Sequence, residues 1–159
     1  MTAGMRPATD EDSAAIVTLI GCCFAEYPGC VLDLPGLDAW MLAPATAYAG
    51  TGGGLRVVEA DGAVVACVGY KPAGPGRVEL KSLYVGAAAR RAGLGARLVA
   101  LVEDAARAGG ASLVELWSDS RFADAHRLYE RLGYIRGSQT RQLHDPSGTT
   151  EYFFDKPLA

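Results

Sequence analysis

Residues 84–99, YVGAAARRAGLGARLV, pass from an apolar stretch through a glycine-broken basic turn into a segment with helical spacing. Gly93 and Gly95 flank the start of that helix, where backbone N–H groups lack partners within the helix and the macrodipole is positive. Glycine allows a ligand to approach such a backbone closely. The stretch also contains arginines and no acidic residue. It therefore predicts a site for a phosphate or a pyrophosphate at the start of a helix.

The segments on both sides of this turn alternate between strand and helix patterns. Before it, residues 77–85 (RVELKSLYV) alternate between apolar and charged side chains, as a strand with one buried face does. After it, apolar residues recur at helical spacing up to a Gly-Gly pair, and residues 112–117 (SLVELW) have the composition of a strand. A strand, a helix and a second strand in this order predict a parallel unit.

The N-terminal part of the chain predicts a strand, a helix and a loop. A short strand is expected around residues 5–6, and Thr9 and Asp12 have capping-box spacing at the start of an amphipathic helix that ends near Pro28. From there to the glycine run GTGGG we expect a loop that contains one short helical piece around Trp40. The glycine run itself lacks the lysine and hydroxyl of a phosphate-binding P-loop, and it predicts a turn into a strand.

The remaining segments predict further strands and one helix. Residues 55–71 predict a hairpin with an Asp-Gly pair as its tight turn. Ser120 is expected to cap a helix that ends at Gly133, and residues 134–143 and 151–156 predict a last pair of strands. No repeat or linker divides the sequence, so we expect an α/β (α+β) protein with a single domain over residues 1–159.

Composition excludes several classes of protein. The 159 residues carry a net charge of −3, which gives no basic surface for nucleic acid and no polybasic patch for a membrane. No run of 18 apolar residues and no signal-peptide pattern occurs, so we expect a cytoplasmic protein that does not bind membranes. The four cysteines (Cys22, Cys23, Cys30 and Cys67) have neither metal-site nor redox spacing, which predicts buried, reduced thiols and no metal.

Two other interpretations of the basic turn remain open on the residues alone. A dinucleotide-binding fold would use a G-x-G-x-x-G motif, but Leu98 stands where its last glycine or alanine belongs, although Glu115 lies near the place of a ribose-binding acid. The turn is also compatible with a plain helix entry that carries solvated arginines. The glycine pair alone does not decide between these interpretations and a coenzyme site.

The sequence resembles the GNAT family of N-acetyltransferases in three segments, the first of which is the strand ELKSLYV, residues 79–85. RRAGLG, residues 90–95, matches the family's Arg/Gln-x-x-Gly-x-Gly/Ala signature, and AHRLYERLGY, residues 125–134, is similar to a later family segment at the right spacing. The resemblance implies a mixed sheet of about six to seven strands flanked by about four helices. It also implies that two parallel strands splay after a bulge, so that the arm of acetyl-CoA fills the gap between them.

The resemblance further implies which residues bind acetyl-CoA as a co-substrate. Two residues of the strand before the turn would offer backbone groups to the pantetheine and the acetyl carbonyl, and the turn would wrap the pyrophosphate. In chain order these residues are Leu83, Val85, Arg90, Arg91, Ala92, Gly93, Leu94 and Gly95. Phe122 stands where many members have an asparagine that contacts the coenzyme arm, and Ser118 or Ser120 is a substitute for that contact.

The chemistry of acetyl transfer needs a proton donor for the leaving thiolate and a proton acceptor for the amine. The resemblance places Tyr129 beside the sulfur, and a tyrosine keeps its proton at neutral pH, which suits a general acid. Glu79 is the candidate base, directly or through water, because strand alternation separates it from Val78 and Leu80. Glu79 is equally compatible with an exposed strand residue, and Tyr129 with a core position.

Other polar residues carry weaker expectations. Glu26 and Asp33 are either surface acids or ligands for a cationic acceptor. His126 is expected to be a partly exposed helix residue close to Tyr129, and His144 an exposed turn residue.

The sequence thus predicts an enzyme that transfers an acetyl group from acetyl-CoA to a primary amine within a ternary complex. The acceptor is a small molecule or a peptide of unknown identity. The alternative is a non-catalytic module that binds or senses acyl-CoA on the same fold. Members of the family commonly add an interface between late strands, so a homodimer is one assembly that the resemblance allows.

Overall fold

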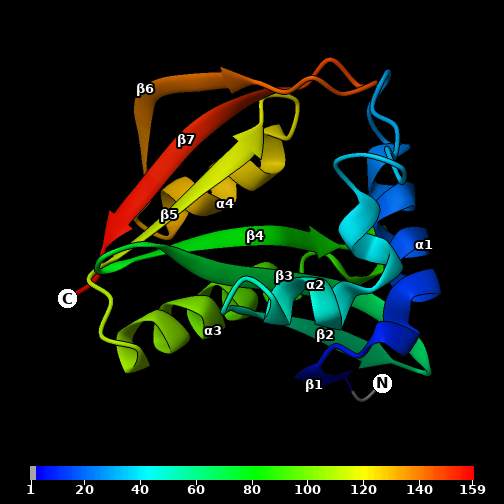
Figure 1. Ribbon diagram of the computed structural model, residues 1–159, viewed down its shortest axis with the longest axis horizontal. Helices are drawn as coiled ribbons and strands as arrows, with labels where there is room; N and C mark the ends of the chain where they lie inside the picture. The colour runs from blue at the N-terminus through cyan, green and yellow to red at the C-terminus, as the bar shows by residue number, and fades with distance from the viewer. Residues whose placement is uncertain (1–2) are drawn as a thin grey trace.

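The computed structural model, which describes residues 3–159, is built around a mixed sheet of seven strands (Figure 1). The sheet order is β1-β2-β3-β4-β5-β7-β6, and only the β4–β5 pair is parallel. The strands are β1 (Ala3–Pro7), β2 (Gly54–Ala60), β3 (Ala63–Gly74), β4 (Arg77–Val85), β5 (Leu113–Asp119), β6 (Ile135–Gln142) and β7 (Thr150–Pro157). The expected mixed sheet is therefore confirmed.

Four α-helices cover the two faces of the sheet: α1 (Ser13–Phe24), α2 (Pro44–Ala49), α3 (Leu94–Ala108) and α4 (Ala123–Arg131). One apolar core joins α3 and α4 to the sheet, and a second core joins α1 and α2 to the opposite face of its N-terminal half. Short 3-10 turns lie at Asp10–Asp12, Ala39–Leu42 and Ala87–Ala89. No helix within residues 3–159 combines the length and apolar character that crossing a bilayer would require.

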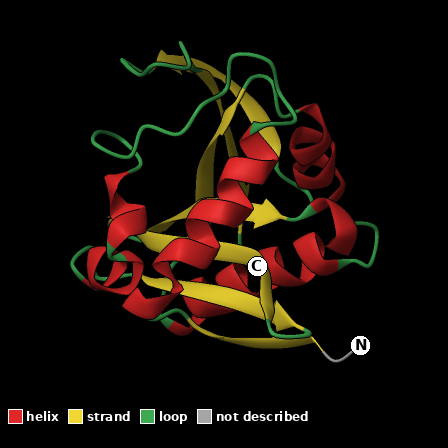
Figure 2. Cartoon of the chain, turned by 90° about the vertical axis from the view of Figure 1, so that its right-hand side faces the viewer, coloured by secondary structure: helices red, strands yellow, loops and turns green. Residues whose placement is uncertain are grey.

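The parallel strands β4 and β5 stay together over a short distance. Their register pairs are Arg77 with Leu113, Val78 with Val114 and Glu79 with Glu115. Beyond these pairs the strands diverge, and the two halves of the sheet separate (Figures 1 and 2). The edge of β4 from residue 80 to residue 85 therefore has no pairing with β5, as the family resemblance implied.

A bulge in β4 lies at the point where the strands separate. Ser82 has a φ of 54°, an uncommon conformation for a residue other than glycine, and the register between β3 and β4 shifts between Cys67 and Gly69. Tyr48 of α2 fixes this bulge, because its hydroxyl forms a 2.7 Å hydrogen bond with Ser82 Oγ. The Tyr48 ring lies over Gly69, where an added Cβ would come within 2.4 Å of it. The bulge is thus supported by a second element.

Several predicted elements match the structure closely. The strand 77–85 and the strands around residue 5 and in the last third of the chain are present. The hairpin turn lies at Asp61 and Gly62, whose φ values of 53° and 78° are those of a type I′ turn. Thr9 begins the first helical turn, and its backbone N–H donates to Asp12 Oδ2 at 2.7 Å.

Other predicted boundaries are wrong. The segment after Trp40 contains α2, which we had assigned to a loop; Pro44 starts this helix because its fixed φ suits a first helical position. Helix α1 ends at Phe24 rather than near Pro28, with turns in between. Strand β3 continues to Gly74, beyond residue 71, where the predicted hairpin ends. Ser120 does not cap α4: Phe122 precedes the helix, and the Ser120 N–H donates to Thr150 O at 2.8 Å.

The dinucleotide-binding interpretation is also wrong. Its fold requires a parallel sheet, whereas β4–β5 is the one parallel pair in the described sheet. Glu115, the proposed ribose ligand, is buried and accepts a 2.7 Å hydrogen bond from Arg77 Nε on the neighbouring strand. The Glu115 carboxylate therefore stabilises the pairing of β4 with β5.

Candidate active site

The basic turn forms a concave backbone at the start of α3. Arg91 and Gly93 have φ values of 66° and 73°, so the chain reverses sharply before Leu94, the first residue of the helix. The first intrahelical bond runs from Arg97 N–H to Gly93 O, which leaves the N–H groups of the preceding turn without helical acceptors. An added Cβ on Gly93 would meet open space, so glycine is needed here for its conformation. Such a turn is suited to hold an anion.

A cleft of about 570 Å³ runs from this turn to the open edge of β4. Seven of the eight residues expected to bind the coenzyme line it: Leu83, Val85, Arg90, Arg91, Gly93, Leu94 and Gly95. The eighth, Ala92, is exposed and does not line the cleft. The residues named by the motif are thus brought together along one continuous groove.

The side chain of Arg90 turns away from the anion-binding turn toward α1. Its two terminal nitrogens donate to the two carboxylate oxygens of Glu26, each at 2.6 Å, and its Nε donates to Val85 O at 2.9 Å. The hydrogen bond from Arg90 lowers the pKa of Glu26. Glu26 is an exposed acid, as one of its two expectations states, and its carboxylate is paired with Arg90.

Two basic residues of α4 line the same cleft and were not singled out from the sequence. Arg127 and Arg131 are one helical turn apart, and Arg127 forms an ion pair with Asp124, which also lines the cleft. Their spacing of four residues on the helix that carries Tyr129 was the available signal.

A second cavity, of about 280 Å³, adjoins the first and is called the acceptor pocket below. The two cavities share four lining residues: Leu83, Tyr84, Phe122 and Ala125. The acceptor pocket is also lined by Tyr129, Glu79 and Ser118. The proposed acid and the proposed base thus face one cavity that meets the coenzyme cleft.

Tyr129 has a buried ring and an accessible hydroxyl. The ring packs against Tyr134 and Phe154, with centroids 5.9 and 5.7 Å away. Within residues 3–159, its hydroxyl forms no hydrogen bond, yet no fully buried polar side-chain atom lacks a partner, so the hydroxyl must reach the pocket. Burial of the side chain raises its pKa well above the ordinary value, so Tyr129 is neutral and retains its proton at physiological pH.

Glu79 lies on the face of β4 opposite the α3 core, as alternation predicted. Among the described residues it forms neither an ion pair nor a side-chain hydrogen bond. Asp33 does not line the acceptor pocket, but Asp38 does, and burial raises the pKa of Asp38. Asp38 was missed because nothing local distinguishes it from other loop acids.

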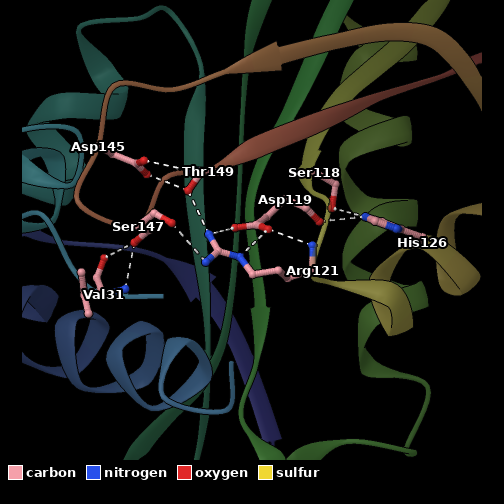
Figure 3. Close-up of polar contacts among 8 residues, drawn as sticks. All are labelled: Val31, Ser118, Asp119, Arg121, His126, Asp145, Ser147 and Thr149. Carbon is pink, nitrogen blue, oxygen red and sulfur yellow. Dashed lines mark hydrogen bonds and ion pairs between the residues drawn. The ribbon is translucent and has the colours of Figure 1, made fainter. Parts of the chain in front are cut away.

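His126 is buried, which corrects the expectation of a partly exposed residue, whereas His144 is exposed as predicted. His126 Nε2 lies 3.1 Å from Ser118 Oγ and 3.0 Å from Asp119 O (Figure 3). A carbonyl oxygen only accepts hydrogen bonds, so Nε2 carries the proton in the neutral ring. Ser118 Oγ then accepts a share of that proton, and its own hydrogen is free to point into the pocket.

An ion-paired network fixes the rim of the acceptor pocket. Arg121 donates to both carboxylate oxygens of Asp119 at 2.9–3.0 Å and reaches Ser147 O and Thr149 Oγ1 in the β6–β7 loop (Figure 3). The Ser147 hydroxyl donates to Val31 O at 3.0 Å, while the Val31 N–H donates to Ser147 Oγ at 2.9 Å. Three segments distant in sequence are thereby held at one rim.

The cysteines lie closer to the site than expected. Cys22 is exposed, which corrects the expectation of buried thiols, while the other three are buried. Cys23 borders the coenzyme cleft and Cys30 the acceptor pocket. Burial raises the pKa of both thiols, so both are protonated and poorly nucleophilic at neutral pH.

Phe122 occupies the junction of the two cavities together with other aromatic rings. Its ring lies 4.9 Å from that of Tyr27 and 6.5 Å from that of Tyr84. Of the two serines considered as substitutes for the missing asparagine, Ser118 lines the acceptor pocket and Ser120 lines neither cavity. Residues 3–159 contain no cluster of side chains that could hold a metal ion.

Solved structures of acetyltransferases share this fold. A GNAT-family acetyltransferase from Staphylococcus aureus Mu50 superposes with a TM-score of 0.84 at 14% identity, covering 99% of this chain and 100% of that one. A phosphinothricin acetyltransferase from Sinorhizobium meliloti, in complex with acetyl-CoA, gives 0.77 at 20% identity, covering 100% and 90%. A ribosomal-protein-alanine N-acetyltransferase from Brucella melitensis gives 0.74 at 22%, covering 98% and 99%.

Sequence comparisons address the family directly. A search of curated protein sequences gave no significant match. The family model described as the acetyltransferase (GNAT) family matches residues 15–134, which include the splayed strands, the anion-binding turn and Tyr129. On this match, supported by the shared fold, the chain belongs to the GNAT family of acetyltransferases.

Proposed function

We propose that this protein transfers the acetyl group of acetyl-CoA to a primary amine by direct attack within a ternary complex. The observation that carries the proposal is the accessible Tyr129 hydroxyl in a pocket that adjoins a cleft with an anion-binding turn. The cleft accounts for coenzyme binding, and the pocket supplies the space for an amine. A proton donor in the pocket beside the cleft is needed for transfer but not for binding alone.

The residues of the cleft fit acetyl-CoA as a co-substrate. The free N–H groups at the start of α3 would bind the pyrophosphate, and Arg131 adds positive charge along the same groove. The unpaired edge of β4 between Leu83 and Val85 would hydrogen-bond the pantetheine arm in the manner of an added strand. Acetyl-CoA would supply the activated thioester carbonyl.

The residues of the acceptor pocket would then manage the protons. The neutral amine nitrogen forms a bond to the thioester carbon while the carbon–sulfur bond breaks, and a backbone N–H near Val85 stabilises the developing oxyanion. Tyr129 gives its proton to the departing thiolate. Glu79, directly or through a water molecule, takes the proton that the amine nitrogen loses. Proton transfer through solvent from Glu79 to Tyr129 then restores the ionised Glu79 and the protonated Tyr129.

The direct route is favoured over an acetylated cysteine because of the state of the thiols. Cys23 and Cys30 border the cavities, yet burial keeps both protonated at neutral pH. Juxtaposition of the two reactants can contribute roughly 7 to 11 kcal/mol, so no covalent intermediate is required.

The test is release of coenzyme A thiol from acetyl-CoA by the purified protein in the presence of a panel of primary amines. We expect thiol release that depends on both the amine and the protein, with the N-acetylated amine identified by mass spectrometry. Coenzyme binding without amine-dependent release would instead favour the acyl-CoA sensor. Failure to bind coenzyme A at all would refute both.

A further inference from the structure

One wall of the acceptor pocket presents two cations, Lys81 and Arg141. Lys81 follows Glu79 on the same face of β4, and Arg141 comes from β6 on the far side of the diverging sheet. Their neighbours on this wall are Trp117 of β5 and Glu151 of β7. Neither the proposed coenzyme contacts nor the proton transfers use these cations.

Arg141 is held in place with part of its guanidinium free. Its Cζ lies 4.4 Å from the centroid of the Trp117 ring, and its Nε donates to Glu151 Oε1 at 2.6 Å. For the part of the chain that the structure describes, its two terminal nitrogens make no hydrogen bond. A guanidinium fixed in this way offers two parallel donors to a planar oxyanion.

Lys81 is half-buried and has no ion-pair partner within residues 3–159. Burial lowers the pKa of its ammonium group; the charge of Glu79 opposes this shift, Lys71 and Arg141 add to it, and Glu151 opposes it. Glu151 balances one of the two pocket cations, and Glu79, the proposed base, faces the incoming amine. No carboxylate of the described residues lies within ion-pair distance of the Lys81 ammonium, although Glu79 and Glu151 line the same pocket, so this ammonium is free to bind a ligand carboxylate.

Resting on the proposed function, we propose that Lys81 and Arg141 form a carboxylate subsite, so that the acceptor is a small amino acid-type amine. The carboxylate would lie between the Lys81 ammonium and the free edge of the Arg141 guanidinium, and the amine would extend toward Glu79 and Tyr129. A cavity of about 280 Å³ suits a molecule of this size. A peptide N-terminus would bring no carboxylate to this wall.

The experiment compares free amino acids with their carboxamides as acceptors, using thiol release with saturating acetyl-CoA. We expect each preferred amino acid to exceed its carboxamide about tenfold to a hundredfold in kcat/KM, the effect of a charge-assisted hydrogen bond. The carboxamide has the less basic amine, so more of it is neutral, and this difference works against the expected result. Equal efficiencies, or preference for carboxamides, would overturn the subsite.

Variants assign the preference to the two side chains. Lys81→Met and Arg141→Gln should each reduce the acid-to-amide ratio of kcat/KM about tenfold. Arg136→Gln is the matched control, because Arg136 lies on the same strand and stacks on Tyr152 at 3.6 Å without lining the pocket. Lys71→Met removes a lysine from the neighbouring strand, also outside the pocket lining. A ratio that survives both pocket variants would refute the assignment.

A binding measurement separates this proposal from the proposed function. Calorimetry with coenzyme A present compares N-acetyl amino acids with their amides as product-like ligands. Acid-selective binding without thiol release would support the subsite while the enzymatic proposal fails. Thiol release without acid selectivity would support the enzymatic proposal and refute the carboxylate subsite. Equal binding of acids and amides, or no binding of either, would count against the subsite.

Discussion

At the residue scale, Tyr129 belongs both to the apolar core and to the wall of the acceptor pocket. Its ring closes the apolar core between Tyr134 and Phe154, while its hydroxyl opens into the acceptor pocket without a partner among residues 3–159. No neighbouring charge competes for its proton, and its raised pKa follows from burial alone. Such a group keeps its proton at neutral pH and can hydrogen-bond to, and protonate, negative charge that develops on a leaving thiolate beside it.

Replacing Tyr129 with phenylalanine should lower kcat about a hundredfold or more, the usual effect of losing a general acid. Coenzyme affinity and the free energy of unfolding should change little, because the ring remains. Thiol-release assays measure kcat, titration with coenzyme A measures affinity, and chemical denaturation measures the free energy of unfolding. Tyr134→Phe is the control: it removes a 2.8 Å hydrogen bond to the buried Glu103, so stability should fall while the chemical step is retained. Equal kcat for wild type and Tyr129→Phe would remove Tyr129 from the mechanism.

His126 should make stability depend on pH near neutrality. Burial lowers its pKa in the folded protein, so the unfolded chain binds more protons as the pH falls. Its stabilising contribution is therefore complete above about pH 6.5 and is lost as the pH falls below that value. Urea unfolding across this range should show a declining free energy of unfolding. The decline should be smaller in His126→Gln than in His144→Gln, and identical slopes would contradict the prediction.

Single residues also show which parts of the candidate site could not be predicted from the sequence. The glycine motif and Tyr129 were found because their spacing along the chain is fixed. Asp38 enters the acceptor pocket from a loop and Arg141 from the distant strand β6, so no local sequence pattern identifies either as a pocket residue. The partners of Glu26 and His126 depend on how α1 and α4 dock, which the sequence does not state.

At the scale of elements, the turn before α3 owes its concave shape to its backbone conformation. Gly93 and Gly110 stand at opposite ends of this helix, both with positive φ, at 73° and 83°, and an added Cβ on either meets open space. Gly95 differs, because its Cβ would come within 3.0 Å of Leu128 on α4. The first glycine therefore shapes the turn proposed to hold the coenzyme, while Gly95 permits close packing of two helices.

Substituting Gly93 with alanine should cost about 1 kcal/mol of stability, because the left-handed conformation strains an L-residue. It should also weaken coenzyme A binding several-fold, since relief of that strain moves the N–H groups. Gly110→Ala carries a similar strain at the far end of α3 and should leave coenzyme affinity unchanged. Chemical denaturation and calorimetry give both quantities. The idea fails if the two variants bind coenzyme A equally well.

Some helices and strands were predicted from the sequence more accurately than others. Strands β2 to β5 and helix α3 were predicted because their periodicity and glycine boundaries are strong. Helix α2 was missed, since its six residues are too few for a periodic pattern to stand out. The start of α4 was misplaced because Ser120 is used by the sheet, through its bond to Thr150, before the helix begins.

At the scale of the whole molecule, the divergence of β4 and β5 divides the sheet into two halves that are joined through three register pairs. Additional links cross this division, such as Glu103 of α3, which accepts hydrogen bonds from Tyr134 and Lys156. The two core clusters lie on opposite sheet faces, and only one of them spans both halves. A ligand that hydrogen-bonds along the free edge of β4 would therefore strengthen the weakest connection.

Coenzyme A should consequently stabilise the protein and protect this edge. At a ligand concentration a hundred times Kd, linkage adds about 2.7 kcal/mol to the free energy of unfolding. Hydrogen exchange should slow most at residues 80–85 and at the start of α3, with little change in the β6–β7 hairpin. Protection spread evenly over the chain, or absent from residues 80–85, would contradict this picture.

The short parallel pairing of β4 with β5 also has a consequence for the protein's resistance to proteolysis. If a metabolite completes the sheet, the lifetime of the polypeptide is coupled to the abundance of that metabolite. Protease digestion with and without coenzyme A would reveal this dependence as a change in cleavage rate at the loops that flank β4 and β5. Nutrient supply would then set how much enzyme persists as well as how fast it turns over.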